Sequence, residues 1–345
     1  MLKNPFRGKG LRHPTLSDMP WPSDDARAPL ALLAHCPAAS ATPLVHSEEL
    51  AKHAGCVEFW IKDERPRMGL GSFKALGAAY AIAAEAPRDV PFETALEGRV
   101  FVTASAGNHG LSVAAGAHVF GARAVIYLAQ SVPEAFADLL RSKGADVVRA
   151  GAIYEESMQA AQDAAAENGW TLLSDSSWDG YSVPAHAVMQ GYTVLAAEIC
   201  EAMQAAPTHV FLQAGVGGLA AAAAAYMRRA WGQEVQIIVV EPDAAPALHH
   251  SIAEGAPLDT QGPVSEMGRL DCKTPSLIAL KGLARDADGF VLVSDQAVAD
   301  VLPVMADAGF ETSASGGAGL AASLTGIVPV PSDARVLCIL SEGAV

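Results

Sequence analysis

One lysine stands out as a residue that could do chemistry. Lys74 lies in the run Ser72-Phe73-Lys74-Ala75 and is the only charged residue between positions 68 and 84. The apolar spacing predicts a helix over 72–85, so Lys74 falls in its first turn, where a positive charge is disfavoured. A lysine that extends to solvent is the ordinary interpretation. The apolar neighbours favour the other one, a desolvated amine with a depressed pKa that acts as a nucleophile.

Three glycine-rich turns could bind an anion. They cover residues 69–74, 105–110 and 213–218. The last two follow short apolar runs and open predicted helices, so they would present backbone N–H groups at a helix N-terminus, where anions bind. In the third turn the glycines would let the backbone approach a phosphate without a Cβ in between. An ordinary tight turn explains any one of them equally well.

Familiar nucleotide motifs fit these turns poorly. A P-loop needs a lysine after its last glycine, and neither Gly71 nor Gly218 is followed by one. The pattern Gly-x-Gly-x-x-Gly fits 215–220 only with Ala220 in the last place, and Glu241 is the candidate ribose-binding acid. A nicotinamide-dependent oxidoreductase is therefore a remote alternative. A reactive lysine together with a phosphate cradle favours pyridoxal phosphate, held as a Schiff base on Lys74.

Charge and cysteine content exclude several other classes. The formal net charge is −15, which repels phosphate backbones and argues against nucleic acid as a partner. The five cysteines form no C-x-x-C pair, so we expect neither a disulfide scaffold nor a metal site, but a reducing cytoplasm. The longest apolar run, 219–227, is about half of a membrane span, and the N-terminus lacks the apolar stretch of a signal peptide. We therefore expect no membrane partner.

The rest of the chain predicts two domains of alternating strands and helices. Its length of 345 residues suits two domains. Residues 1–45 are proline-rich and are expected to form an extended arm. Buried parallel strands are predicted at 57–62, 99–103, 124–128, 146–149, 208–213, 235–240, 289–293 and 335–340. Helices are predicted at 72–85, 107–120, 133–142, 154–167, 186–203, 219–231, 245–253, 276–283, 295–307 and 317–325. This alternation predicts an α/β fold in which each domain is a mostly parallel, twisted sheet flanked by helices.

Taken together, the motifs resemble the signature of fold-type II pyridoxal-phosphate enzymes, the tryptophan synthase β-subunit-like group. The runs that carry the resemblance are Ser72-Phe73-Lys74, Ser105-Ala106-Gly107-Asn108-His109-Gly110, Gly215-Val216-Gly217-Gly218 and Leu340-Ser341-Glu342-Gly343. The resemblance implies a large cofactor-binding domain of residues 1–75 plus 190–345. It also implies a small, mobile domain of residues 76–189 that grips a small amino-acid substrate, and a homodimer.

The resemblance also assigns roles to single residues. Lys74 would carry the cofactor, Asn108 would lie beside its 3-hydroxyl, and Ser341 would face its pyridine nitrogen. The phosphate would be held by the backbone N–H groups of Gly215, Val216, Gly217 and Gly218. The substrate carboxylate would be gripped by the loop of Ser105, Ala106, Gly107, Asn108 and His109.

Within this group the chain most resembles the diaminopropionate ammonia-lyases, through runs such as Trp178-Asp179-Gly180-Tyr181 and Met189-Gln190-Gly191-Tyr192. Asp175 would match an active-site carboxylate of those enzymes, although a helix or turn cap is an equal alternative. The chain departs from them at Ala106, where they have an aspartate that acts as the base on the face opposite the lysine. Alanine there is similar to threonine dehydratases. We therefore expect one-base chemistry through Lys74 on L-configured substrates.

The expected reaction is α,β-elimination from a β-substituted amino acid such as 2,3-diaminopropionate, giving a 2-oxo acid and ammonia. Lys74 would take the α-proton, and Asp175 or the phosphate would assist the leaving group. One alternative is a threonine or serine dehydratase acting on an L-β-hydroxy amino acid. Another is a non-catalytic protein that binds pyridoxal phosphate or an amino acid. The charged loop Glu266–Lys273 is interpreted as solvated, with a substrate entrance or an oligomer contact as alternatives.

Overall fold

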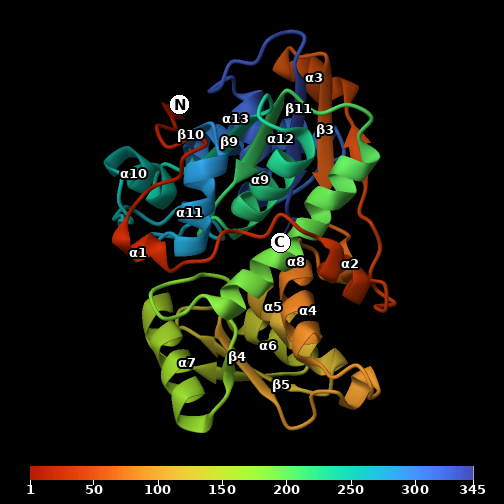
Figure 1. Cartoon of the computed structure of the whole chain (residues 1–345), viewed down its shortest axis with the longest axis vertical. Helices are drawn as coiled ribbons and strands as arrows, with labels where there is room; N and C mark the ends of the chain where they lie inside the picture. The colour runs from red at the N-terminus through yellow and green to blue at the C-terminus, as the bar shows by residue number, and fades with distance from the viewer. Residues whose placement is uncertain (345) are drawn as a thin grey trace.

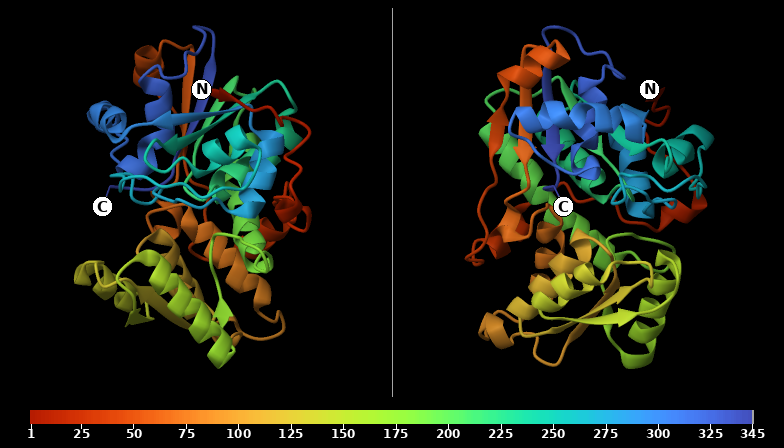
Figure 2. Two further views of the ribbon diagram at one scale, coloured as in Figure 1. Left: turned by 90° about the vertical axis from the view of Figure 1, so that its left-hand side faces the viewer. Right: turned by 180° about the vertical axis from the view of Figure 1, so that it is seen from behind.

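Two β-sheets lie at opposite ends of the molecule, in a computed structural model that describes residues 1–344. One sheet has seven strands and the other four. Helices α4 (Lys74–Glu85) and α8 (Val183–Ala202) pass between them, as Figure 1 and the two turned views of Figure 2 show. The expected α/β fold with two mostly parallel sheets is confirmed.

The seven-stranded sheet has a parallel centre and two antiparallel edges. Its strands, in spatial order, are β1 (Leu2–Lys3), β10 (Gly289–Val293), β9 (Gln236–Pro242), β8 (His209–Gln213), β11 (Arg335–Leu340), β3 (Glu58–Asp63) and β2 (Leu44–His46). Only β1 and β2, at the two edges, run antiparallel to their neighbours. Because both faces are covered by helices, the middle of each central strand is apolar, as in residues 210–212 of β8 and 237–240 of β9.

Alternate residues of β11 show how the two faces divide. Val336, Cys338 and Leu340 pack into one apolar cluster, and Leu337 and Ile339 into the other. The first cluster is closed by α3 (Glu48–Ala54), α12 (Asp295–Asp307) and α13 (Ala314–Leu324). The second is closed by α9 (Gly218–Trp231), α10 (Ala247–Glu254) and α11 (Leu277–Asp286), together with α4 and α8.

The four-stranded sheet is parallel throughout. Its order is β6 (Ala145–Arg149), β5 (Arg123–Leu128), β4 (Val100–Ala104) and β7 (Thr171–Leu172). One face packs on α5 (Asn108–Val119) and shares the apolar cluster of α4, α8 and α9. The other face packs on α7 (Tyr154–Asn168), while α6 (Glu134–Ser142) lies beside β6. A continuous core therefore joins the two sheets across α4 and α8.

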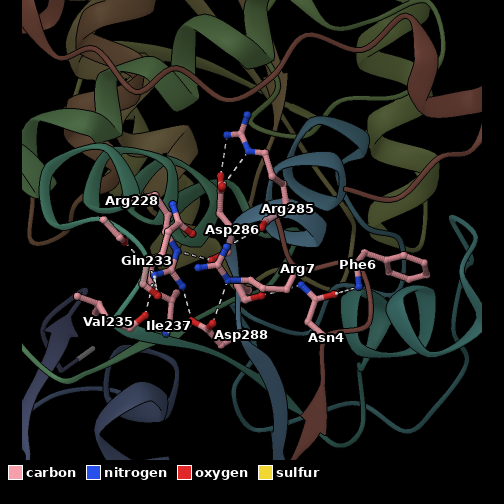
Figure 3. A network of polar contacts seen from close by, with 12 residues as sticks. Asn4, Phe6, Arg7, Arg228, Gln233, Val235, Ile237, Arg285, Asp286 and Asp288 are labelled. Atoms are coloured by element: carbon pink, nitrogen blue, oxygen red, sulfur yellow. Dashed lines mark hydrogen bonds and ion pairs between the residues drawn. The ribbon is translucent and has the colours of Figure 1, made fainter. Parts of the chain in front are cut away.

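The prediction of an extended N-terminal arm is wrong. Residues 1–45 contain β1, part of β2, and the helices α1 (Pro14–Ser17) and α2 (Arg27–Leu33). The segment is anchored by Asn4, whose amide donates to the carbonyl oxygens of Leu283, Ala284 and Ala287. Beside it, Arg7 and Arg228 both pair with Asp288 (Figure 3). The contacts of Asn4 and Arg7 join residues more than 270 positions apart, so local pattern did not reveal them.

The other predicted elements are present, with ends within three residues of those expected. The structure adds α3, two short strands (β2 and β7), and two 3₁₀ turns, η1 (Arg67–Gly69) and η2 (Phe92–Thr94). Among residues 1–344 no helix combines the length and apolar character that crossing a membrane requires.

Candidate active site

Lys74 is fixed at the first residue of α4 by contacts with the end of β11. Ser72 forms a β-bridge with Glu342, and the Phe73 N–H donates to the carbonyl oxygen of Ser341 at 3.1 Å. The Lys74 side chain passes over the ring of Phe73, with Nζ 5.3 Å from the ring centre. Its Nζ pairs with the carboxylate of Asp175. The lysine therefore lies where the two sheets face each other.

Asp175 is held by a well-bonded loop that follows β7. The Ser174 N–H donates to the hydroxyl of Tyr181 at 2.9 Å, and that hydroxyl donates to the carbonyl oxygen of Leu172. Trp178 and Tyr181 stack with ring centres 4.2 Å apart. Asp175 does not cap the following helix, whose N-cap is Ser182. The run Trp178-Asp179-Gly180-Tyr181 thus shapes the loop that presents the Asp175 carboxylate to Lys74.

The expectation of a depressed pKa for Lys74 is wrong for the amine as it is paired here. Burial acts to lower the pKa of Lys74, but the charge and hydrogen bond of Asp175, together with Tyr192 and Cys272, outweigh burial and raise it above its ordinary value. For Asp175, burial acts to raise the pKa, but the charge and hydrogen bond of Lys74, together with the charge of His109, outweigh burial and lower the pKa below its usual range. The pair is therefore an ammonium and a carboxylate. Asp175 lies 101 positions away in the chain, so the local sequence around Lys74 contained no sign of it.

The loop from Ser105 to Gly110 is a compact turn at the carboxyl end of β4. The hydroxyl of Ser105 accepts from the N–H groups of Gly107 and Gly110, at 3.3 and 3.0 Å. A Cβ on Gly110 would lie 2.9 Å from the Ser105 carbonyl oxygen, so the turn requires glycine there. Ala106 is exposed on this loop and offers only a methyl group. Asn108 then begins α5.

His109 fixes the same loop to the neighbouring strand. Its Nε2 lies 2.8 Å from the carbonyl oxygen of Leu173, next to β7. Its Nδ1 is buried and has no hydrogen-bond partner within residues 1–344. Burial lowers the pKa of His109, so the neutral imidazole donates from Nε2 to the carbonyl oxygen and keeps Nδ1 as a free acceptor.

The turn from Gly215 to Gly218 fits a phosphate. It follows β8 and opens α9, with Gly217 as N-cap at φ +98° and no capping side chain from residues 1–344. A Cβ on Gly215 would lie 3.0 Å from the Cys272 Sγ, and one on Gly217 would lie 2.9 Å from the Leu248 Cδ1. The first N–H groups of a helix without a cap are free to bind an anion. The conformation and the crowding both require glycine.

Glu342 connects Asn108 to the seven-stranded sheet. It accepts hydrogen bonds from Asn108 Nδ2 and from the hydroxyl of Ser313, and pairs with Arg269 Nη1 at 3.2 Å. Only 4% of Glu342 is exposed, and this burial raises its pKa. Ser341, also buried, lies next to it at the end of β11. The motif around Ser341 was visible in the sequence, but nothing there gave Glu342 a partner.

The interpretation of Glu266–Lys273 as a solvated loop is wrong in part. Glu266 is exposed. Arg269 instead turns toward Glu342 and toward Gly107, where a Cβ would lie 3.8 Å from the Arg269 Nε. Lys273 donates to the carbonyl oxygens of Ala244 and Pro263. This loop therefore borders the site.

The candidate residues come together at one place between the two sheets. Lys74, Asp175 and His109 interact electrostatically across the gap between the sheets. Asn108 and Ser341 lie beside them through their contacts with Glu342 and Phe73. The Gly215–Gly218 turn approaches the same place, since a Cβ on Gly218 would lie 3.8 Å from the Asp175 carbonyl oxygen.

The chain matches the family model described as "Pyridoxal-phosphate dependent enzyme" over residues 36–342. It is 32% identical to diaminopropionate ammonia-lyase of Escherichia coli (strain K12) over 274 residues, which cover 75% of this chain and 69% of that enzyme. It is 27% identical to L-threonine ammonia-lyase of Geobacter sulfurreducens, over 88% of this chain and 71% of that enzyme.

Solved structures agree. The Escherichia coli diaminopropionate ammonia-lyase in complex with D-serine superposes with a TM-score of 0.87 at 27% identity, covering 99% of this chain and 93% of that one. A second structure of that enzyme holds an aminoacrylate-PLP azomethine reaction intermediate and gives a TM-score of 0.85 at 28% identity, covering 99% and 92%.

Proposed function

The chain belongs to the pyridoxal-phosphate dependent enzymes, and we propose that its substrate is 2,3-diaminopropionate or a similar amino acid with a β-amino leaving group. Its similarity to ammonia-lyases makes it a lyase that uses pyridoxal 5′-phosphate for α,β-elimination. When bound, the cofactor stabilises the negative charge that develops at the α-carbon. The protein residues hold it, orient the substrate and move protons.

Each part of the site would have one task. Lys74 would carry the cofactor on Nζ, and its amine would take the α-proton of an L-substrate. The backbone of Gly215, Val216, Gly217 and Gly218 would bind the phosphate. Asn108 and Ser341 would contact the ring substituents. The substrate carboxylate would be bound by the loop of Ser105, Ala106, Gly107, Asn108 and His109.

The observation that carries the proposal is the pairing of Asp175 with a cation. Asp175 already accepts the ammonium of Lys74 as its partner, and with Lys74 on the cofactor the carboxylate would be free to pair with an ammonium group of the substrate. A β-ammonium group needs no further proton and is attracted by a carboxylate. Asp175 therefore suits a β-amino substrate better than serine or threonine.

The test compares kcat/KM for L-2,3-diaminopropionate, L-serine and L-threonine. The reaction is measured by the release of 2-oxo acid and ammonia. We expect diaminopropionate to be the best of the three. Asp175→Asn keeps the shape and removes the charge, and it should lower kcat/KM for diaminopropionate more than for serine. A preference for serine, or an equal loss on both substrates, would reject the β-amino assignment.

A dehydratase acting on an L-β-hydroxy amino acid is the second candidate, and Ala106 is the observation that favours it. In the loop Ser105–Gly110, the alanine at position 106 resembles the residue that threonine dehydratases have there. The same substrate comparison decides between the two activities.

We also infer a cytoplasmic homodimer in which residues 76–189 move as a small domain against 1–75 plus 190–345. The resemblance to fold-type II enzymes supports the dimer and the domains. The five cysteines, all free in residues 1–344, support a reducing compartment. Light scattering on the eluting protein would test the dimer, since a monomer mass rejects it.

A further inference from the structure

Tyr192 has a buried hydroxyl without a partner. The residue lies in the middle of α8 and is 1% exposed. Its ring packs edge-on against Phe73, with ring centres 4.9 Å apart. No atom within residues 1–344 makes a hydrogen bond to the hydroxyl. Because a buried polar group without a partner is unfavourable, such a group in an otherwise well-bonded site indicates a ligand.

Two glycines bring Tyr192 to this position. A Cβ on Gly191 would lie 2.5 Å from the Leu76 carbonyl oxygen, and a Cβ on Gly77 would lie 2.5 Å from the Tyr192 Cε1. Helices α4 and α8 can therefore cross closely only because both residues are glycine. The crossing places the Tyr192 ring about one helical turn along α4 from Lys74.

The other edge of the ring faces the glycine turn. A Cβ on Gly218 would lie 3.6 Å from the Tyr192 Cε2. Gly218 is the first residue of α9, whose N-terminus has no capping side chain from the described residues. The unpaired hydroxyl and the free N–H groups of this helix thus border the same space.

The charged groups that face Tyr192 are Lys74 and Asp175. Burial raises the pKa of Tyr192, the charge of Lys74 lowers it, and that of Asp175 raises it, so the net pKa lies above its ordinary value. The phenol therefore keeps its proton and is a donor. Lys74 already has Asp175 as its partner, which leaves the hydroxyl available to another acceptor.

We propose that the Tyr192 hydroxyl donates a hydrogen bond to the cofactor phosphate, as a side-chain donor in a cradle otherwise built from backbone N–H groups. The proposal rests on the phosphate lying at Gly215–Gly218 but not on the choice of substrate. The phosphate would then be held from two elements, the start of α9 and the middle of α8. Tyr192 would set how deeply the cofactor lies against the α4–α8 crossing.

The test is Tyr192→Phe, which keeps the ring and removes the hydroxyl. The dissociation constants of pyridoxal 5′-phosphate and of pyridoxal, which lacks the phosphate, are measured on the protein after cofactor removal. Loss of a hydrogen bond to a charged group predicts about 10- to 100-fold weaker binding of pyridoxal 5′-phosphate. Pyridoxal should bind the variant as it binds the wild type. An unchanged affinity for the phosphorylated form, or an equal loss for both, overturns the proposal.

Tyr80→Phe is the matched control. Tyr80 lies on α4 at the same helix pair, but its hydroxyl already donates to Gln190 Oε1 at 3.2 Å. Tyr80→Phe should leave the dissociation constants of pyridoxal 5′-phosphate and of pyridoxal unchanged. The ³¹P signal of the bound cofactor should move in Tyr192→Phe and stay in place in Tyr80→Phe.

The outcomes of this binding test can be told apart from those of the substrate comparison that tests the proposed function. Cofactor binding is measured without substrate, so a preference for β-hydroxy substrates leaves this result untouched. If Gly217→Val also binds the cofactor normally, the phosphate site itself is wrong. If Gly217→Val loses the cofactor but Tyr192→Phe does not, only the role of Tyr192 is rejected.

Discussion

Lys74 at the start of α4 and Asp175 in the loop after β7 form an ion pair across the gap between the two sheets. The charge of Asp175 raises the pKa of Lys74 and the charge of Lys74 lowers the pKa of Asp175, so each group favours the ionised form of the other. The two residues are thus adjacent, although Lys74 is held at the end of β11 in one sheet and Asp175 follows β7 of the other. Movement of the four-stranded sheet relative to the other would change their separation.

Lys74 is predicted to carry the cofactor. Borohydride reduction of the holoenzyme, followed by peptide mass mapping, should place the pyridoxyl group on the peptide that contains Lys74. Lys74→Ala should lose the label and lower kcat for elimination by at least about 10²- to 10⁴-fold, the usual contribution of a general base. A label on a different lysine would contradict the assignment.

Gly217→Val is predicted to weaken cofactor retention. The residue has φ +98°, which side chains rarely adopt, and a Cβ would lie 2.9 Å from the Leu248 Cδ1 and 3.0 Å from the Ala279 Cβ, so valine strains the turn. Gly232 ends the same helix at φ +78° with nothing within 4 Å of a Cβ, which makes Gly232→Val a control for backbone strain alone. Both variants should lose stability in thermal unfolding, but only Gly217→Val should lose cofactor in dialysis. Equal retention in the two would argue against a phosphate at this turn.

Glu241 is predicted to make stability depend on pH. It is fully buried at the end of β9, and burial raises its pKa from 4.5 to about 8, against the N–H groups of Leu248 and His249 that it accepts from. Between these two values the folded state binds a proton that the unfolded state has released. The stabilisation is therefore complete below pH 4.5 and is lost as pH rises to about 8.

Urea unfolding from pH 5 to 9 measures this loss, which should amount to a few kcal/mol at about 1.4 kcal/mol per pKa unit. Glu241→Gln should flatten the profile. Glu254→Gln, on the exposed end of α10, should leave it unchanged. An identical slope in wild type and Glu241→Gln would show that the carboxyl is ionised in the folded protein.

The sequence was sufficient to predict elements that depend only on residues close together in the chain. The strand at 335–340 was predicted with its observed bounds, because every residue after Arg335 is apolar and both faces of a buried strand require that. The glycine turns at 105–110 and 213–218 were also visible, because their glycines directly follow short apolar runs in the sequence. What was missed depends on distant partners. Helix α1 lies against Lys281, which donates to the carbonyl oxygens of Leu16 and Ser17.

The site follows the same rule. Lys74 was identifiable from its neighbours, but its charge state is set by Asp175, which no local pattern connects to it. Asn108 was named, but its link through Glu342 spans 234 positions. Tyr192 belonged to a recognised run, but its unpaired hydroxyl became visible only when α8 was placed against α4 and α9.

The enzyme is predicted to prefer L-substrates, and Ala106 is the reason. The loop that would grip the substrate offers only a methyl group at this exposed position, so no base is expected on the face opposite Lys74. A general base contributes about 10²- to 10⁴-fold, so D-isomers should react more slowly by that order. Turnover of matched D- and L-2,3-diaminopropionate measures the ratio.

Ala106→Asp supplies the missing carboxylate and should raise activity on the D-isomer while leaving much of the activity on the L-isomer. Ala106→Asn has the same size without the charge and should not raise activity on either isomer. Lys74→Ala should abolish turnover of the L-isomer in the wild type and in Ala106→Asp. Comparable wild-type rates on the two isomers would mean that another acid reaches the opposite face, with Asp175 as the first residue to examine because it supplies a carboxylate to the same site. The one-base mechanism would then be wrong.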